Sequence, residues 1–101
     1  MQLLRTPTFE ATLQQFRSLA ADADSFDDDL ARALSDIVAN PVSGDLVVSS
    51  QTIVQRATRM SDAPPLYLVH TFEPPDRILL DRVIEASQVE AYRTRIPAPL
   101  L

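Results

Sequence analysis

The stretch 40–45, Asn-Pro-Val-Ser-Gly-Asp, constrains the fold of this chain more than any other feature. Proline lacks a backbone N–H and its ring clashes with the preceding helical turn, so a helix must end before Pro41. Gly44 is the only glycine in the sequence, and glycine adopts a positive φ at little cost. The stretch therefore predicts the end of a helix and a turn into a strand.

Residues before this turn show the spacing of two helices. Thr6-Pro7 is typical of an N-cap followed by proline at the first helical position. Apolar residues then recur on one helical face, at Phe9, Leu13, Phe16 and Leu19/Ala20. A second apolar stripe, ended by Asn40-Pro41, contains Phe26, Leu30, Ala33/Leu34 and Ile37. Because the link at 20–24 is short, the two helices are expected to form an antiparallel hairpin.

An acidic run marks the start of the second helix. Ser25-Phe26-Asp27-Asp28 reads as a variant capping box, with aspartate where glutamate is usual. The three aspartates at 27–29 would then lie in the first turn, near the positive end of the helix dipole. A cation site is the alternative interpretation, but no partner carboxylates follow at ligand spacing. We therefore expect a structural role and no metal.

Residues after the turn have the sequence pattern of strands. Apolar or β-branched runs occupy 46–48, 52–60, 66–72 and 78–84, and the short run Gln2–Arg5 is a further candidate. On the 66–72 strand, Leu66, Leu68, His70 and Phe72 would share one face, and Tyr67, Val69 and Thr71 the other. We expect a loop at 61–65, a hairpin at 73–76 and a short helix at 86–92.

These elements predict an α+β fold in which an N-terminal helical hairpin packs on a mainly antiparallel sheet of four to five strands. The length of 101 residues fits a single domain over residues 1–95. Two prolines near the C-terminus predict a loose tail at 96–101.

The amino-acid composition excludes several kinds of functional site. The chain has no cysteine, which excludes disulfides, thiolate catalysis and cysteine-based zinc sites, and one histidine excludes a multi-histidine metal site. No glycine-rich phosphate loop is present. We expect no cofactor. No apolar run approaches the ~20 residues that span a bilayer, so no membrane partner and a cytoplasmic location are expected.

Charge is divided at the same turn. The net charge is −5, which argues against broad, nonspecific nucleic-acid binding. All nine basic residues are arginine, and six of them follow the turn, whereas aspartates cluster before it. Any binding or catalytic function is therefore expected in the second half of the chain.

The order of the motifs resembles the RelE/ParE superfamily of bacterial toxins, particularly its HigB-like members. The matching segments are Thr6-Pro7-Thr8-Phe9, Ala39 to Val47, Arg56-Ala57-Thr58-Arg59, Tyr67-Leu68-Val69 and Ile78-Leu79-Leu80. This resemblance implies a RelE-like fold and the toxin component of a type II toxin–antitoxin system. It also implies a cognate antitoxin as the partner protein.

The nuclease members of that superfamily are metal-independent endoribonucleases that cut messenger RNA, usually on the ribosome, and so inhibit translation. The ribose 2′-hydroxyl attacks the adjacent phosphate while the protein stabilises charge and moves protons. Arg56 and Arg59 are then the candidates that face phosphate, because arginine pairs with phosphate oxygens in a bidentate way. Tyr92 and Arg93 match the C-terminal tyrosine and basic residues. His70 is a candidate acid or base by its chemistry alone.

Structural interpretations stand beside these roles. Arg56 and Arg59 are three positions apart, so on a regular strand they point to opposite faces unless a bulge intervenes. A lone histidine on an apolar strand face is more often a packed, hydrogen-bonded residue. The chain lacks lysine and has Leu68 where the superfamily has arginine. These departures favour, as the alternative function, a non-catalytic protein-binding module, either a ParE-type poison or a degenerate toxin. An unrelated α+β domain with a chance match is the third interpretation.

Overall fold

The structure is a computed structural model that describes residues 2–49, 53–62 and 64–95, with side chains up to residue 92 in the last range. The predicted tail at 96–101 lies outside these ranges, as does Thr52, the first residue of a predicted strand. The elements in chain order are β1 (Gln2–Arg5), α1 (Pro7–Leu19), α2 (Ala23–Ala39), β2 (Asp45–Ser49), β3 (Val54–Asp62), β4 (Pro65–Glu73), β5 (Arg77–Glu85), the 3-10 helix η1 (Ala86–Gln88) and α3 (Val89–Arg95). No helix in these ranges is long and apolar enough to cross a membrane.

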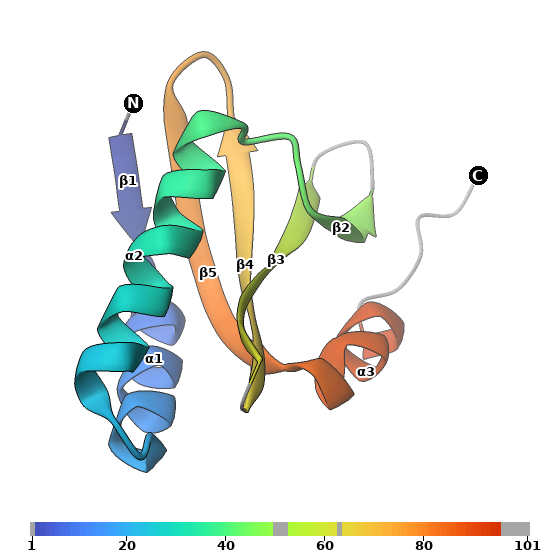
Figure 1. The fold of residues 1–101 in the computed structure, drawn as a ribbon. Coiled ribbons are helices and arrows are strands. Elements are labelled where there is room, and N and C mark those ends of the chain that lie inside the picture. The colour runs from blue at the N-terminus through green and yellow to red at the C-terminus, as the bar shows by residue number, and fades with distance from the viewer. Residues whose placement is uncertain (1, 50–52, 63, 96–101) are drawn as a thin grey trace.

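The sheet has five strands in the order β1-β5-β4-β3-β2. Strands β2 to β5 pair antiparallel, as their short connections predict, but β1 pairs parallel with β5. The sheet is therefore mixed. Two helices and three strands separate β1 from its neighbour in sequence, so no hairpin dictates its direction. Figure 1 shows α1 and α2 on one side of the sheet and α3 on the other. We call these two sides the helix-side face and the α3 face.

The start of α1 is confirmed. The N–H of Phe9 donates to the Thr6 hydroxyl oxygen at 3.0 Å, and Pro7 is the first helical residue. At the predicted core position Leu19/Ala20, Ala20 is the residue that packs against the core. Leu19, the last residue of α1, is 75% exposed.

The start of α2 differs from the predicted capping box at Ser25. Asp22 is the N-cap, and its carboxylate accepts from the N–H groups of Asp24 and Ser25. These bonds lower the pKa of Asp22. Asp24 is thus the acidic residue of the first turn, while Asp27 lies beyond it and pairs with Arg17 of α1 at 2.9 Å. The helix ends at Asn40 as expected.

Gly44 has the predicted positive φ, at 99°. A side-chain carbon there would lie 2.9 Å from the backbone oxygen of Ala57 on β3. Glycine is thus required at this turn both by conformation and by space.

The predicted loop at 61–65 is mostly strand. Strand β3 continues through Ser61 and Asp62, and β4 begins at Pro65. A register shift between Arg59 and Ser61 lets the strand continue past Met60, and the Ser61 hydroxyl donates to the Pro64 carbonyl at 2.6 Å. A bulge of this kind leaves no signal in hydrophobic alternation.

Two buried clusters lie on the two faces of the sheet. The helix-side cluster contains Phe9, Leu13, Phe26, Ala33, Ile37, Met60, Leu66, Leu68, Ile78, Leu80 and Val83. The α3-face cluster is smaller and contains Val47, Val48, Ala57, Val69, Ile84 and Tyr92. The predicted alternation along β4 is confirmed, because Leu66 and Leu68 belong to the first cluster and Val69 to the second.

Candidate functional site

The structure divides the predicted site residues between the two faces of the sheet. Arg56 and His70 are cross-strand partners of β3 and β4 on the helix-side face. Arg59 lies opposite Tyr67 on the α3 face, where Tyr92 is also buried. Arg93 belongs to α3, but its side chain lies outside the described part of the chain. The described members of the predicted set therefore do not form one site.

Arg59 is held at the surface by several contacts. Its guanidinium pairs with Asp62 at 3.1 Å, donates to the Ser61 carbonyl at 3.2 Å, and lies 5.6 Å from the centre of the Tyr67 ring. The Asp62 side chain is 91% exposed, so this ion pair contributes little to stability. Arg59 thus contacts the end of β3 and the ring of Tyr67 on β4. None of these contacts is with Tyr92.

His70 is a packed residue. It is 1% exposed, and its Nε2 lies 2.8 Å from the carbonyl oxygen of Pro41. Because a carbonyl can only accept, Nε2 carries the proton and donates. Burial lowers the pKa of His70, the hydrogen bond to Pro41 opposes that change, and the positive charge of Arg56 lowers it further. A neutral, covered imidazole that fixes the turn after α2 fits the structural interpretation of this residue.

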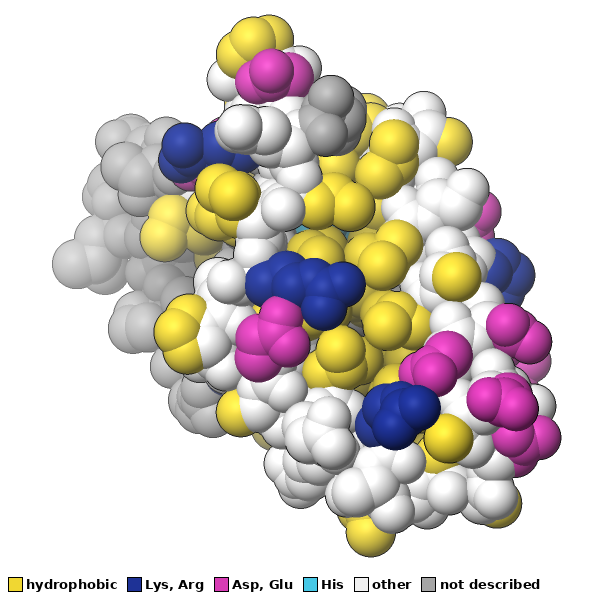
Figure 2. All heavy atoms as spheres, turned by 90° about the vertical axis from the view of Figure 1, so that its left-hand side faces the viewer, with side chains coloured by type: hydrophobic (Ala, Val, Ile, Leu, Met, Phe, Trp, Pro, Cys, Tyr) yellow, Lys and Arg dark blue, Asp and Glu magenta, His cyan; other side chains and the backbone are white. Residues whose placement is uncertain are grey.

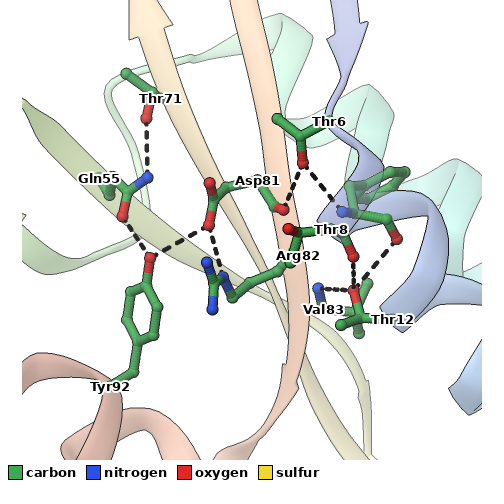
Figure 3. Close-up of polar contacts among 10 residues, drawn as sticks. Thr6, Thr8, Thr12, Gln55, Thr71, Asp81, Arg82, Val83 and Tyr92 are labelled. Carbon is green, nitrogen blue, oxygen red and sulfur yellow. Dashed lines mark hydrogen bonds and ion pairs between the residues drawn. The ribbon is translucent and has the colours of Figure 1, made fainter. Parts of the chain in front are cut away.

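Tyr92 lies at the centre of a polar cluster on the α3 face (Figure 3). Its hydroxyl is 2.6 Å from Oε1 of Gln55 and 3.2 Å from Oδ2 of Asp81. The same Asp81 oxygen accepts from Nε of Arg82 at 2.7 Å, and the Arg82 guanidinium lies 4.9 Å from the Tyr92 ring centre. Gln55 in turn donates to Thr71 at 3.3 Å. The cluster therefore links β3, β4, β5 and α3.

A bulge brings Asp81 and Arg82 together. Along β5, Leu80 pairs with His70 and Arg82 pairs with Val69, so Asp81 is the extra residue. On a regular strand these neighbours would point to opposite faces, whereas here their side chains form an ion pair. The sequence signal was the polar pair that interrupts the apolar run 78–84. The bulge that brings these two side chains together could not be predicted from the polar pair. Neither Gln55 nor Asp81 nor Arg82 was predicted as a site residue.

Thr6, the N-cap of α1, and Thr12 within α1 hold this part of β5 (Figure 3). The strand β1 pairs with β5 only as far as Leu80, so the edge beyond it needs other partners. The Thr6 hydroxyl donates to the Asp81 carbonyl at 2.8 Å, and the Val83 N–H donates to the Thr12 hydroxyl oxygen at 2.9 Å. Both bonds satisfy backbone groups of the bulged segment and fix its position against α1.

A cavity of about 260 Å³ opens beside the cluster, between α1 and the C-terminal helices. Arg82 and Tyr92 form part of its wall, with Gln15 and Phe16 from α1 and Gln88 from η1. A tyrosine hydroxyl beside a carboxylate can pass a proton, and a guanidinium can hold an anion. In this arrangement, however, the Arg82 charge is already balanced by Asp81.

Within the described ranges, no group of three or more histidine, aspartate or glutamate side chains is placed to hold a metal ion. No protein-family model, curated protein or solved structure matches this chain.

Proposed function

We propose that this chain is the toxin component of a type II toxin–antitoxin pair with a RelE/ParE-like fold, and that it acts by binding a protein. The order of elements supports the first part. A strand, two helices ended by Asn40-Pro41, four further strands and a terminal helix follow one another as the resemblance implies.

One observation carries the choice of protein binding over RNA cleavage. Of the seven arginines whose side chains are described, six pair with carboxylates: Arg5, Arg17, Arg32, Arg59, Arg77 and Arg82. The seventh, Arg56, lies on the face opposite Tyr92. Cleavage of RNA without a metal needs cations that are free to hold phosphate, on the same face as the group that moves the proton. The described α3 face offers no arginine without a carboxylate partner.

The helix-side face supports a protein partner. Helix α1 packs mainly on β5 and α2 mainly on β3, and Figure 2 shows hydrophobic side chains gathered in a furrow on this side of the molecule. Partly buried apolar residues from both helices and from β4 pack on the core there: Phe16, Leu30, Leu34 and Phe72. An apolar stripe on a partner would complete their burial.

RNA cleavage is the second candidate, because the Tyr92, Asp81 and Arg82 side chains meet at the wall of a cavity. In this version Asp81 and Tyr92 would move the proton of the ribose 2′-hydroxyl. The terminal amino groups of Arg82, which the bond through Nε leaves to other partners, would hold the phosphate. Phosphate would have to compete with Asp81 for the guanidinium.

The test is induction of the chain in a bacterial host, with growth and transcript integrity measured together. We expect growth arrest with intact transcripts, and the same arrest from Tyr92→Phe and Arg82→Gln. Tyr67→Phe is the matched control, because Tyr67 lies on the same face outside the polar cluster. Cleaved transcripts that become intact in Tyr92→Phe and Arg82→Gln, but not in Tyr67→Phe, would establish the nuclease instead. Normal growth while the folded chain accumulates would rule out a toxin.

A further inference from the structure

A second pocket lies on the helix-side face, where the turn after α2 meets β3 and β4. Its volume is about 210 Å³, and it is lined by Pro41, Val42, Val54, Arg56, His70 and Phe72. Pockets for drug-sized ligands occupy roughly 300–1,000 Å³, so this one suits a smaller molecule or a single residue of a partner.

Arg56 supplies an uncommitted positive charge to this pocket. It is the one arginine, among those whose side chains are described, that has no carboxylate partner. Its contact with the Gly44 carbonyl is long, at 3.4 Å. A guanidinium offers five N–H donors in a fork that fits a carboxylate. The charge therefore favours an anionic ligand with a flat, two-oxygen group.

His70 supplies an unused acceptor directly across from Arg56. Because Nε2 donates to Pro41, Nδ1 of the neutral ring carries a lone pair, and this buried atom has no partner among the described residues. A buried polar atom without a hydrogen bond costs free energy, which a ligand N–H would recover once side chains of the pocket wall move aside to uncover Nδ1. Residues directly opposite on paired strands lie about 5 Å apart at Cβ, so one small ligand spans the distance between the two side chains.

The rim of the pocket is apolar and exposed. Val42 is 58% exposed and Val54 is 41% exposed, and neighbouring Leu46 is 45% exposed. Residues Leu46 and Arg56 are cross-strand partners, so Leu46 continues the same face. This rim favours a ligand whose body is an aliphatic side chain.

We propose that this pocket binds the carboxyl-terminal residue of an apolar peptide or an equivalent free N-acyl amino acid. The carboxylate pairs with Arg56, and the aliphatic side chain packs on Val42 and Val54. The adjacent N–H donates to Nδ1 of His70, which a movement of the pocket wall on binding uncovers. The proposal goes beyond the toxin function and does not rest on it.

The test is titration of the full chain with N-acetyl-L-leucine. Binding is monitored by calorimetry and by the amide chemical shifts in NMR spectra. For a ligand of this size we expect a dissociation constant on the order of 1 mM. The shifts should centre on Val42, Val54 and His70. Shifts confined to the cavity at Arg82 and Tyr92 would overturn the proposal.

Two small analogues separate the contacts. N-acetyl-L-leucinamide lacks the carboxylate, and 4-methylpentanoate lacks the N–H; we expect each to bind about tenfold more weakly. Equal binding of the amide would refute the role of Arg56, and equal binding of 4-methylpentanoate would refute the role of His70.

The matched variants are Arg56→Gln and Arg59→Gln, which remove one arginine from each face of the same strand. We expect about tenfold weaker binding of N-acetyl-L-leucine by Arg56→Gln and no change in Arg59→Gln. Well-dispersed NMR spectra of both variants exclude unfolding as the cause. Equal losses in the two variants would contradict the proposal.

A longer ligand distinguishes a protein terminus from a free N-acyl amino acid as the natural ligand. An acetylated pentapeptide that ends in leucine should bind about tenfold more tightly than N-acetyl-L-leucine if the natural ligand is a protein terminus. Equal affinity supports a free acyl amino acid. Either result agrees with the proposed pocket, whereas failure of the free-carboxylate peptide to outcompete its C-terminal amide would overturn it.

Discussion

The helix-side face is closed by large apolar side chains, whereas the α3 face is closed by small aliphatic ones and a polar cluster. Phe9 of α1, Ile37 of α2 and Met60 of β3 are each fully buried between the helices and the sheet. On the other face, Tyr92 anchors α3 through hydrogen bonds to Gln55 and Asp81. The difference indicates that burial of large apolar side chains contributes most of the packing on the first face, whereas α3 is held on the second face mainly by directional contacts. Substitutions on the two faces should therefore differ in size and in kind.

The largest effect is expected from Phe9→Ala, which empties the helix-side core. Phe9 is 0% exposed, and deletion of a buried phenyl ring typically costs about 3–5 kcal/mol because a cavity remains. Urea unfolding of the variant and the parent chain measures the difference. Leu19→Ala is the control, because Leu19 is exposed and should change stability by less than about 0.5 kcal/mol. A similar loss in both variants would contradict the division between core and surface.

The next effect is expected at the turn that joins the helices to the sheet. Gly44→Ala combines a strained positive φ with a contact of 2.9 Å to the Ala57 carbonyl, and should destabilise the chain by about 1–3 kcal/mol. Equilibrium unfolding measures the change. Ser43→Ala tests whether any substitution in the turn has this result; it removes one exposed hydrogen bond to the Asn40 carbonyl and should cost about 1 kcal/mol or less. Equal costs would remove the special role of Gly44.

A smaller effect is expected on the α3 face from Tyr92→Phe. The change keeps the ring and removes the hydroxyl that Gln55 and Asp81 share, so the cost should be about 1 kcal/mol. Amide hydrogen exchange should quicken mainly in α3, because among its described side chains only Val89 joins Tyr92 in packing on the α3-face cluster. Tyr67→Phe is the matched control, since within the described residues the Tyr67 hydroxyl makes no hydrogen bond. Uniformly faster exchange across the sheet would contradict a local role.

The contrast between the faces also explains what the sequence could predict. Proline at position 41, glycine at position 44 and the helical spacing of Phe9 and Leu13 are local signals, and the elements they predict are present. The pairing of β1 with β5 depends on residues far apart in sequence, so its parallel direction gave no local signal. The start of α2 was misplaced because Ser25 and Asp22 are both good N-caps, and the competition between them is settled by hydrogen bonds.

The candidate site was predicted less well, because its residues are brought together by contacts between segments far apart in the sequence. Tyr92 was identified, but its partners Gln55 and Asp81 were not, because a bulge in β5 and the docking of α3 bring them together. The spacing of Arg56 and Arg59 correctly predicted opposite faces. Residue type indicated which groups could do chemistry, whereas strand register determined which of them meet.

The smallest effect at neutral pH is expected from the titration of His70, because the ring is mostly uncharged there in both the folded and the unfolded chain. Burial and Arg56 lower the pKa of His70 on folding. Below about pH 6.5, the ordinary pKa of histidine, the unfolded chain therefore binds a proton that the folded chain does not. Stability should be full above that pH and should fall as pH decreases toward the lowered pKa. The carboxylates of Asp22 and Asp27, whose pKa values are also lowered, lose their contribution only at more acidic pH.

Urea unfolding at several pH values between 5 and 7.5 measures how steeply the free energy of unfolding changes with pH. His70→Gln has no titratable ring and can still donate to the Pro41 carbonyl, so its stability should vary less over this range. An unchanged slope in His70→Gln would place the titration elsewhere and would leave the helix-side face without a pH-sensitive group at the turn.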